Sequence, residues 1–294
     1  MMRTRTHITE RSGSIARYLV LASALCCALV SCLPDPLEVK SVPDPAVQIV
    51  VSSQIIPDQS VVVLLTRTFG ALDAGDNSDP FALLDLIAVN DAVVTIEGPH
   101  GRDTLNSLGN GLYGDVVVPF EAGDQYDLHI KSDELGEAHA TTVVQSRVAF
   151  ANIDADLFYN GFNDTLAQIT YSLEDSAERN FYMINVQEVE REDFIENLLN
   201  PRAFTVLLTD DGFNGRFFEE RFRVFPRDYQ PGDTIAVSLS NISEEYYEFM
   251  KLRIDNRFSI VELVSEPVNY PSNVVGGKGY FNLYLPDVRF FVFD

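Results

Sequence analysis

The sequence predicts a mainly β fold of two sandwich-like domains, the second of which carries one or two short helices. Short segments rich in Val and Ile recur along the chain, and turn-forming residues separate them. One of these segments, 126–132, alternates apolar and polar side chains with the period of a half-buried strand. With 46% apolar residues among 294, the chain is long enough to build two ordinary cores.

The first predicted domain spans residues 47–148. Its expected opening strands, 47–56 and 60–68, flank the turn Pro57-Asp58-Gln59, and residues 73–80 are expected to form an acidic loop. A turn is expected at 98–101. The remaining expected strands are 92–97, 112–118, 126–132 and 138–148. Strands of this length and spacing favour a sandwich of the Ig-like or prealbumin-like kind.

The second predicted domain spans residues 149–294 and begins with a loop-rich junction at 150–163. Two helices are expected. The segment 191–199 has one apolar face and ends before Asn200-Pro201, and 244–255 follows the candidate caps Asn241 and Ser243. The expected strands are 167–173, 180–186, 203–209, 221–225, 234–239, 259–264, 279–285 and 288–293. This domain is therefore predicted to be β-rich with short helices.

The N-terminus predicts an export signal over residues 1–31. Four arginines and a single glutamate precede an uncharged apolar run, 18–30, which is too short to span a bilayer of about 30 Å as a helix. The run ends in Leu29-Val30-Ser31-Cys32, which fits a bacterial lipobox. We expect lipidation of the Cys32 sulfur and cleavage just before it. An ordinary signal peptide with an incidental cysteine, or a short membrane anchor, is the alternative.

Lipidation predicts how the chain meets the membrane. Two or more acyl chains of the palmitate type anchor a protein stably, whereas one holds it marginally. Residues 32–46 contain Pro34, Pro36, Pro43 and Pro45. Because proline favours extended backbone, this segment is expected to be a semi-rigid tether between lipid and body.

The charge of the chain limits its partners. The net charge is −23, and removal of 1–31 takes away four Arg and one Glu, so the mature charge is −23 − 3 = −26. Nucleic acid and anionic lipid are disfavoured as partners, because both need Lys and Arg to neutralise phosphate. Cys32 is the one cysteine left after cleavage, so no intramolecular disulfide is expected.

Two glycine-rich segments resemble nucleotide-binding motifs in the wrong context. The run Gly109-Asn110-Gly111 leads directly into an expected strand rather than a helix, so a hairpin turn is the better interpretation. The second segment lacks the flanking residues of a phosphate loop. We interpret it as a turn that seats a strand, with a loop binding site as the alternative; its residues are Gly276, Gly277, Gly279 and Tyr280.

Metal and catalytic signatures are weak. Asp73, Asp76 and Asp79, with Asn77 between them, could offer oxygen ligands to calcium, but the spacing is not that of an EF-hand. Asp154 and Asp156 form a second acidic pair. The three histidines beyond the predicted signal are interpreted as surface residues: His100, His129 and His139. The sequence thus predicts no catalytic residue, no cofactor and no metal beyond these weak calcium candidates.

Six segments occur in a recognisable order along the chain: the Val/Ile strand 47–56 after the tether, 91–98, 111–113, 123–130, 271–274 and 276–281. In this order they resemble a family of Bacteroidota-type outer-membrane lipoproteins, the domain-of-unknown-function 4249 family. The resemblance implies an outer-membrane lipoprotein, often encoded near TonB-dependent transporters, and implies no known catalytic residues. Leu33-Pro34 intervenes between the cysteine and Asp35, where the family often has a charged cluster. Surface display and periplasmic orientation therefore both stay open.

The expected function is that of a non-enzymatic accessory lipoprotein. It would bind a TonB-dependent transporter, or a ligand delivered to one, through loops at the ends of its sandwiches. An adhesion or scaffold protein of the cell envelope is the alternative. A hydrolase with carboxylates in a cleft between the domains is a further possibility, but a chain with 44 acidic residues contains suitable pairs by chance.

Overall fold

The computed structural model describes residues 46–294 except for 57–59, 70–79, 115–116, 162–163, 190–203, 226–227 and 257–269. Several predictions fall outside these residues and are not tested by it. They are the signal and lipobox with Cys32, the tether, the calcium candidates Asp73, Asp76 and Asp79, the helix 191–199 and the strand 259–264. Within the described ranges, no helix combines the length and apolar character needed to cross a bilayer.

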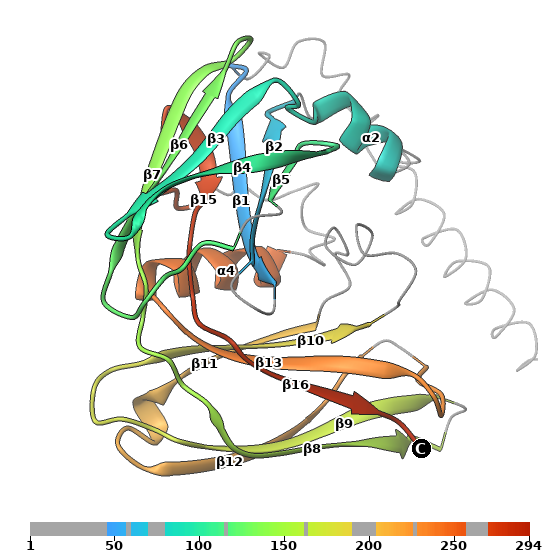
Figure 1. The fold of residues 1–294 in the computed structure, drawn as a ribbon. Helices are drawn as coiled ribbons and strands as arrows, with labels where there is room; N and C mark the ends of the chain where they lie inside the picture. The colour runs from blue at the N-terminus through green and yellow to red at the C-terminus, as the bar shows by residue number, and fades with distance from the viewer. Residues whose placement is uncertain are drawn as a thin grey trace, which may run out of the picture. The chain divides into compact units, whose positions relative to one another are not determined.

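Strands from residues 49–143 and from residues 274–280 build a nine-stranded sheet (Figure 1). Its strands, in spatial order, are β14 (Val274–Val275), β7 (Gly136–Val143), β6 (Gln125–Ser132), β3 (Ala92–Gly98), β4 (Gly101–Gly109), β5 (Leu112–Gly114), β2 (Ser60–Arg67), β1 (Ile49–Ile56) and β15 (Gly277–Tyr280). The two outer strands, β14 and β15, are consecutive in the chain, and Gly276 alone separates them. The sheet therefore closes on itself through a C-terminal segment.

The remaining strands form two smaller sheets. The four-stranded sheet has the order β11 (Phe204–Thr209), β10 (Phe181–Glu188), β13 (Thr234–Ile242), β16 (Asp287–Val292). The three-stranded sheet has the order β12 (Phe217–Arg223), β9 (Thr165–Glu174), β8 (Phe150–Tyr159). Side chains from both sheets share one buried cluster, which includes Ile169, Tyr171, Ile184 and Val237. The prediction of a mainly β, sandwich-like fold is confirmed.

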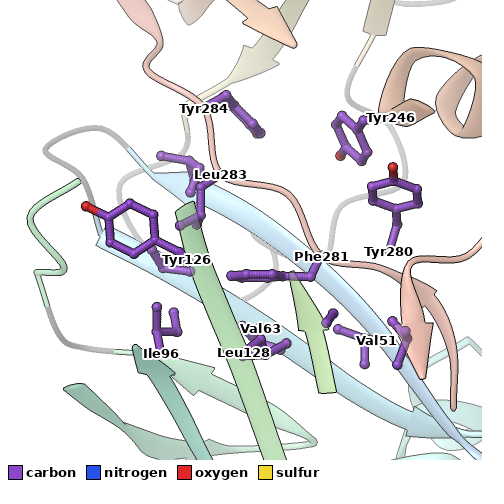
Figure 2. Packing of buried hydrophobic residues seen from close by; sticks show 14 of the residues in the cluster. Val51, Val63, Ile96, Tyr126, Leu128, Tyr246, Tyr280, Phe281, Leu283 and Tyr284 are labelled. Carbon is purple, nitrogen blue, oxygen red and sulfur yellow. The ribbon is translucent and has the colours of Figure 1, made fainter. Parts of the chain in front are cut away.

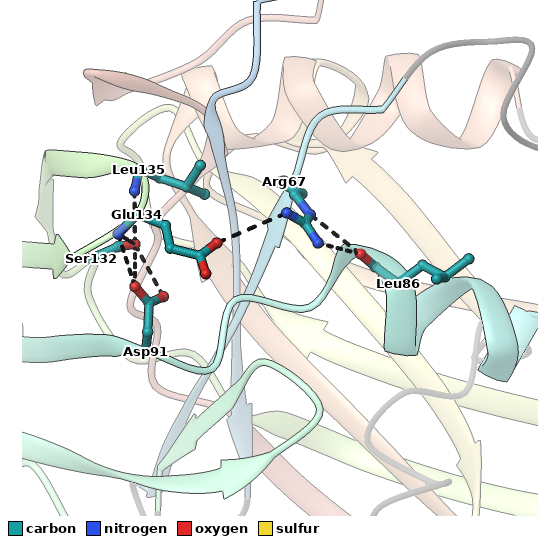
Figure 3. Close-up of polar contacts among 6 residues, drawn as sticks. All are labelled: Arg67, Leu86, Asp91, Ser132, Glu134 and Leu135. Carbon is teal, nitrogen blue, oxygen red and sulfur yellow. Dashed lines mark hydrogen bonds and ion pairs between the residues drawn. The ribbon is translucent and has the colours of Figure 1, made fainter.

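Two α-helices lie in the described part of the chain, α2 (Pro80–Ile87) and α4 (Glu244–Asn256). The sequence predicted α4 and its cap, and the Ser243 hydroxyl accepts a hydrogen bond from the Tyr246 N–H at 3.2 Å. It did not predict α2. Figure 3 shows how the Arg67 guanidinium of β2 donates two hydrogen bonds, of 3.2 and 2.8 Å, to the Leu86 carbonyl near the end of α2.

Some predicted boundaries were wrong. The loop-rich junction expected at 150–163 is the ten-residue strand β8, which pairs with β9 along its length. β4 was not predicted, because its sequence GRDTLNSLG has few apolar or β-branched residues, and its pairing with β3 holds it in the sheet. The strand expected at 279–285 ends early, at Tyr280, and the structure describes the first three residues of the strand expected at 112–118 as β5.

The core of the first sandwich includes residues distant in sequence. Phe281, Leu283 and Tyr284 of the C-terminal segment lie among strand side chains such as Val51 and Leu128 (Figure 2). The same buried cluster also contains residues of β10, β13 and α4, namely Phe181, Met183, Ile242, Tyr246, Tyr247 and Phe249. Strands of the predicted second domain, 149–294, thus complete the sheet and core of the predicted first domain, 47–148.

Candidate functional site

The glycine segment 276–279 joins β14 to β15: Gly276 is the turn residue, and Gly277 and Gly279 lie in β15. β15 runs parallel to β1, with Val51 opposite Gly279. Gly279 has a φ of +93°, and a Cβ there would overlap the Val51 carbonyl oxygen. A Cβ on Gly276 would lie 2.5 Å from the Glu137 carbonyl oxygen, and one on Gly277 would lie 2.5 Å from that of Ile49. The lack of a side chain at these three glycines is therefore what lets the segment approach two strands at once.

Tyr280 ends this segment inside the core. Its ring centroid lies 5.3 Å from that of Tyr246 and 5.1 Å from that of Phe249. Burial raises the pKa of the Tyr280 phenol, and the carboxylate of Glu245 adds to the shift. A turn is found at Gly276 as predicted, but Gly277 and Gly279 belong to the strand β15, which ends at Tyr280. A binding role for these residues stays a prediction.

Side-chain hydrogen bonds fasten the rest of this C-terminal segment. The Asn273 amide donates to the carbonyls of Thr141 and Phe281, at 3.0 and 2.8 Å, and its oxygen accepts the Phe281 N–H at 2.9 Å. The buried Ser53 hydroxyl donates to the Asn282 carbonyl at 3.0 Å and accepts the Asn282 N–H at 2.8 Å. These contacts replace the ladder hydrogen bonds of the strand predicted over 279–285, which stops at Tyr280.

The second acidic pair lies on a strand. Asp154 and Asp156 are exposed residues of β8, opposite Thr170 and Gln168 of β9. Because they are two apart, they point to the same face of the sheet. Within the described residues, neither belongs to a group of three or more acidic, histidine or cysteine side chains with ligand atoms in mutual reach.

The structure brings His100 together with two carboxylates. Its Nε2 lies 3.5 Å from Asp124 Oδ2. One ligand atom each from His100, Glu121 and Asp124 lies within 4.8 Å of the others. Reasoning from the sequence had treated His100 as an isolated surface residue and had not considered Glu121 or Asp124. Recognising them would have required knowing that β3 pairs with β6, which places the ends of two turns side by side.

His129 and His139 also prove to be neighbours. They are directly opposite each other on β6 and β7, and both are exposed. Directly opposed residues in an antiparallel pair have Cβ atoms about 4.5–5.5 Å apart. The prediction that both histidines lie on the surface is confirmed. The sequence had not predicted that they are neighbours.

Buried tyrosines in the second sandwich are paired with carboxylates. The Tyr171 hydroxyl donates to Glu220 Oε2 at 2.9 Å, and the Tyr182 hydroxyl donates to Asp175. Burial, and then the adjacent carboxylate, raise the pKa of both phenols well above the usual value. Both tyrosines therefore remain protonated hydrogen-bond donors at neutral pH, which is a structural role rather than that of a base.

Taken together, these features define a β-sandwich protein whose C-terminal segment closes the first sheet. The chain belongs to the family described as "Domain of unknown function (DUF4249)", which matches residues 35–288. No match was found among the curated proteins.

Solved structures give only a distant likeness. A two-domain fibronectin type-III segment of chicken tenascin is 9% identical, with 66% of this chain and 90% of that chain covered and a TM-score of 0.20. A tetra-tandem repeat from the extending region of a large adhesion protein is 13% identical, with coverages of 67% and 45% and a TM-score of 0.20. The chicken interferon gamma receptor alpha chain is 13% identical, with coverages of 68% and 90% and a TM-score of 0.18. Likenesses at these TM-scores carry no argument about function.

Proposed function

We propose that this protein is a non-enzymatic, outer-membrane-anchored lipoprotein that acts as an accessory or ligand-binding partner of a TonB-dependent transport system. The observation that carries the proposal is Leu29-Val30-Ser31-Cys32 at the end of a short apolar run preceded by arginines. This pattern is that of a bacterial lipoprotein signal. Acylation of the Cys32 sulfur would hold the folded body at the membrane surface.

The family match supports this proposal. It begins at residue 35, three residues after Cys32, so the matched region starts almost where the mature chain is proposed to start. The resemblance to that family implies an envelope lipoprotein and a gene neighbourhood with TonB-dependent transporters. The loops that join the strands would supply the contact surface, because loops on a rigid β scaffold are where binding residues concentrate.

Affinity purification tests the proposed partnership. The protein is expressed in its native host with a C-terminal tag and is recovered from membranes in mild detergent. Mass spectrometry should identify an outer-membrane transporter or its ligand-binding component in the eluate. The matched control is Cys32→Ala. This variant should no longer be recovered in the membrane fraction, and the partner should be absent from its eluate. Recovery of the anchored protein without any membrane partner would contradict the proposal.

A further inference from the structure

We propose that His100, Glu121 and Asp124 form a binding site for a divalent transition-metal ion such as Zn²⁺. One ligand atom from each side chain lies within 4.8 Å of the other two, and the His100 Nε2 is 3.5 Å from Asp124 Oδ2. The side chains of His100 and Asp124 are 44% and 30% exposed, so an ion can reach them from solvent. Zn²⁺ is bound at 2.0–2.2 Å from such atoms, so the three side chains would have to rotate inward when the ion binds.

The sheet itself creates this juxtaposition. β3 and β6 are antiparallel neighbours, with Glu97 opposite Asp127. The end of β3 therefore lies beside the start of β6. His100 belongs to the turn that follows β3, and Asp124 immediately precedes β6. Residues 24 positions apart in the chain thus meet at one end of the sheet.

The core holds the acidic turn in place. The Gly123 N–H donates to the Val144 carbonyl at 2.8 Å, and the Val144 N–H donates to the Asp124 carbonyl at 3.0 Å. Just before the turn, Phe120 is buried and packs edge-on against Tyr126, with ring centroids 6.2 Å apart. Because the turn that carries Glu121 and Asp124 is held on both sides, its backbone loses little conformational entropy when an ion binds.

Tyr126 also packs against the end of β3, just before the turn that carries His100. The Tyr126 ring occupies the space where a Cβ on Gly98 would lie, so β3 and Tyr126 are in close contact. The Tyr126 hydroxyl donates to the Pro119 carbonyl at 3.0 Å. Tyr126 thus contacts residues that precede both turns, Gly98 before His100 and Pro119 before Glu121.

The donor set points to the class of metal. An imidazole nitrogen with two carboxylates is a set that Zn²⁺ and related ions accept, whereas Ca²⁺ and Mg²⁺ prefer oxygen ligands alone. The ion would also offset the mutual repulsion of Glu121 and Asp124. Three protein ligands leave a fourth tetrahedral position for water or for a group from a bound molecule.

The exposed pair His129 and His139 is a competing metal ligand set, because the two imidazoles are directly opposite on β6 and β7. The experiment must therefore separate the two sites. Tag-free mature protein, purified from membranes in mild detergent, is titrated with ZnCl₂ by calorimetry at neutral pH. The variants are His100→Ala, Glu121→Gln and, as the matched control, His139→Ala. Circular dichroism confirms that each variant is folded.

The proposal predicts one Zn²⁺ per chain, with affinity reduced at least about tenfold in His100→Ala and Glu121→Gln and changed less than about twofold in His139→Ala. Co²⁺ in place of Zn²⁺ should give visible absorption bands that are lost in His100→Ala. A millimolar excess of Ca²⁺ should leave the Zn²⁺ affinity unchanged. The proposal is overturned if the intact protein binds no Zn²⁺, if binding is equal in all variants, or if His139→Ala alone abolishes it.

Discussion

Gly279 shows how much of this fold depends on the absence of one side chain. Its backbone lies against the Val51 carbonyl, at a φ of +93° that other residues rarely adopt. The sequence indicated a glycine-rich turn here, because three glycines within four residues are a turn signal. It did not indicate which strand the glycines approach, because that contact joins residues more than 200 positions apart.

Replacing Gly279 with alanine should destabilise the protein severely. The added Cβ would overlap the Val51 carbonyl oxygen, so we expect a loss of more than about 3 kcal/mol in the free energy of unfolding. Gly136→Ala is the matched control. Gly136 has a similar φ of +85° but has open space around it, so the same substitution should cost only about 1–2 kcal/mol. Urea unfolding of both variants measures the difference, and equal losses would contradict the proposed contact.

The hydrogen bonds that Asp91 accepts from Ser132 and Glu134 (Figure 3) should make the stability of the first sandwich depend on pH. Desolvation by burial raises the pKa of its carboxyl. The hydrogen bonds that it accepts from the Glu134 N–H and the Ser132 hydroxyl outweigh this, so the pKa lies below the usual value. The stabilisation is therefore present above the unfolded-state pKa of about 3.9 and is lost as the pH falls through the lower folded-state pKa.

Asp91→Asn should lower the urea midpoint of unfolding at neutral pH. The difference in midpoint between the variant and the unmodified protein should narrow as the pH falls below about 4. The reason is that protonation removes the charge that the two donors stabilise. The substitution should also cost less in a Ser132→Ala background, because one of the donors is already missing. A difference that stays constant down to low pH would show that the carboxylate charge plays no part.

At the scale of elements, local pattern and long-range pairing were predictable to different degrees. β6 was predicted correctly because Tyr126, Leu128 and Ile130 alternate with polar residues, and these three are buried in the structure. β8 was missed because Asp154, Asp156 and Asn152 make its sequence resemble a loop. Its hydrogen bonds to β9 hold it as a strand in spite of its low propensity.

The local sequence of a strand gave no indication of which distant strand it pairs with. Nothing in the composition of residues 274–280 indicates that β14 joins β7 while β15 joins β1. The candidate metal site was missed for the same reason, since His100 meets Glu121 and Asp124 only when β3 pairs with β6. Contacts of this kind depend on the order in which strands pair, and a single sequence does not indicate that order.

Asn273 should control how firmly the closing segment is held. Its side chain makes three hydrogen bonds, two of them to Phe281 and one to Thr141. Asn273→Ala should therefore increase amide hydrogen exchange across 277–285 by about tenfold or more, equivalent to a loss of about 1.4 kcal/mol or more in local stability. Mass spectrometry of exchanged peptides measures this.

Ser272→Ala is the control for this exchange experiment. The Ser272 hydroxyl accepts one hydrogen bond, from the Val274 N–H at 3.2 Å, so its loss should have a smaller effect. Peptides from β8 should exchange at unchanged rates in both variants, because β8 pairs only with β9 among the described strands. Equal exchange across 277–285 in Asn273→Ala and in the unmodified protein would show that the segment is held by other contacts.

At the scale of the whole molecule, the folded β-sandwich part of the chain, here called the body, is proposed to be anchored through one acylated cysteine, Cys32. A mature net charge of −26 would keep this body away from an anionic membrane surface, because like charges repel over about a Debye length. The core is shared between distant parts of the chain, as Phe181, Tyr246 and Phe281 belong to one buried cluster. The loops of this body would then be the surface that contacts a partner.

Mass spectrometry of the N-terminal peptide of the natively produced protein tests this account most directly. The account predicts that the mature chain starts at Cys32 and carries the mass of at least two acyl chains on that residue. A free Cys32 thiol, or a mature N-terminus at another residue, would contradict both the envelope anchoring and the proposed link to a transporter.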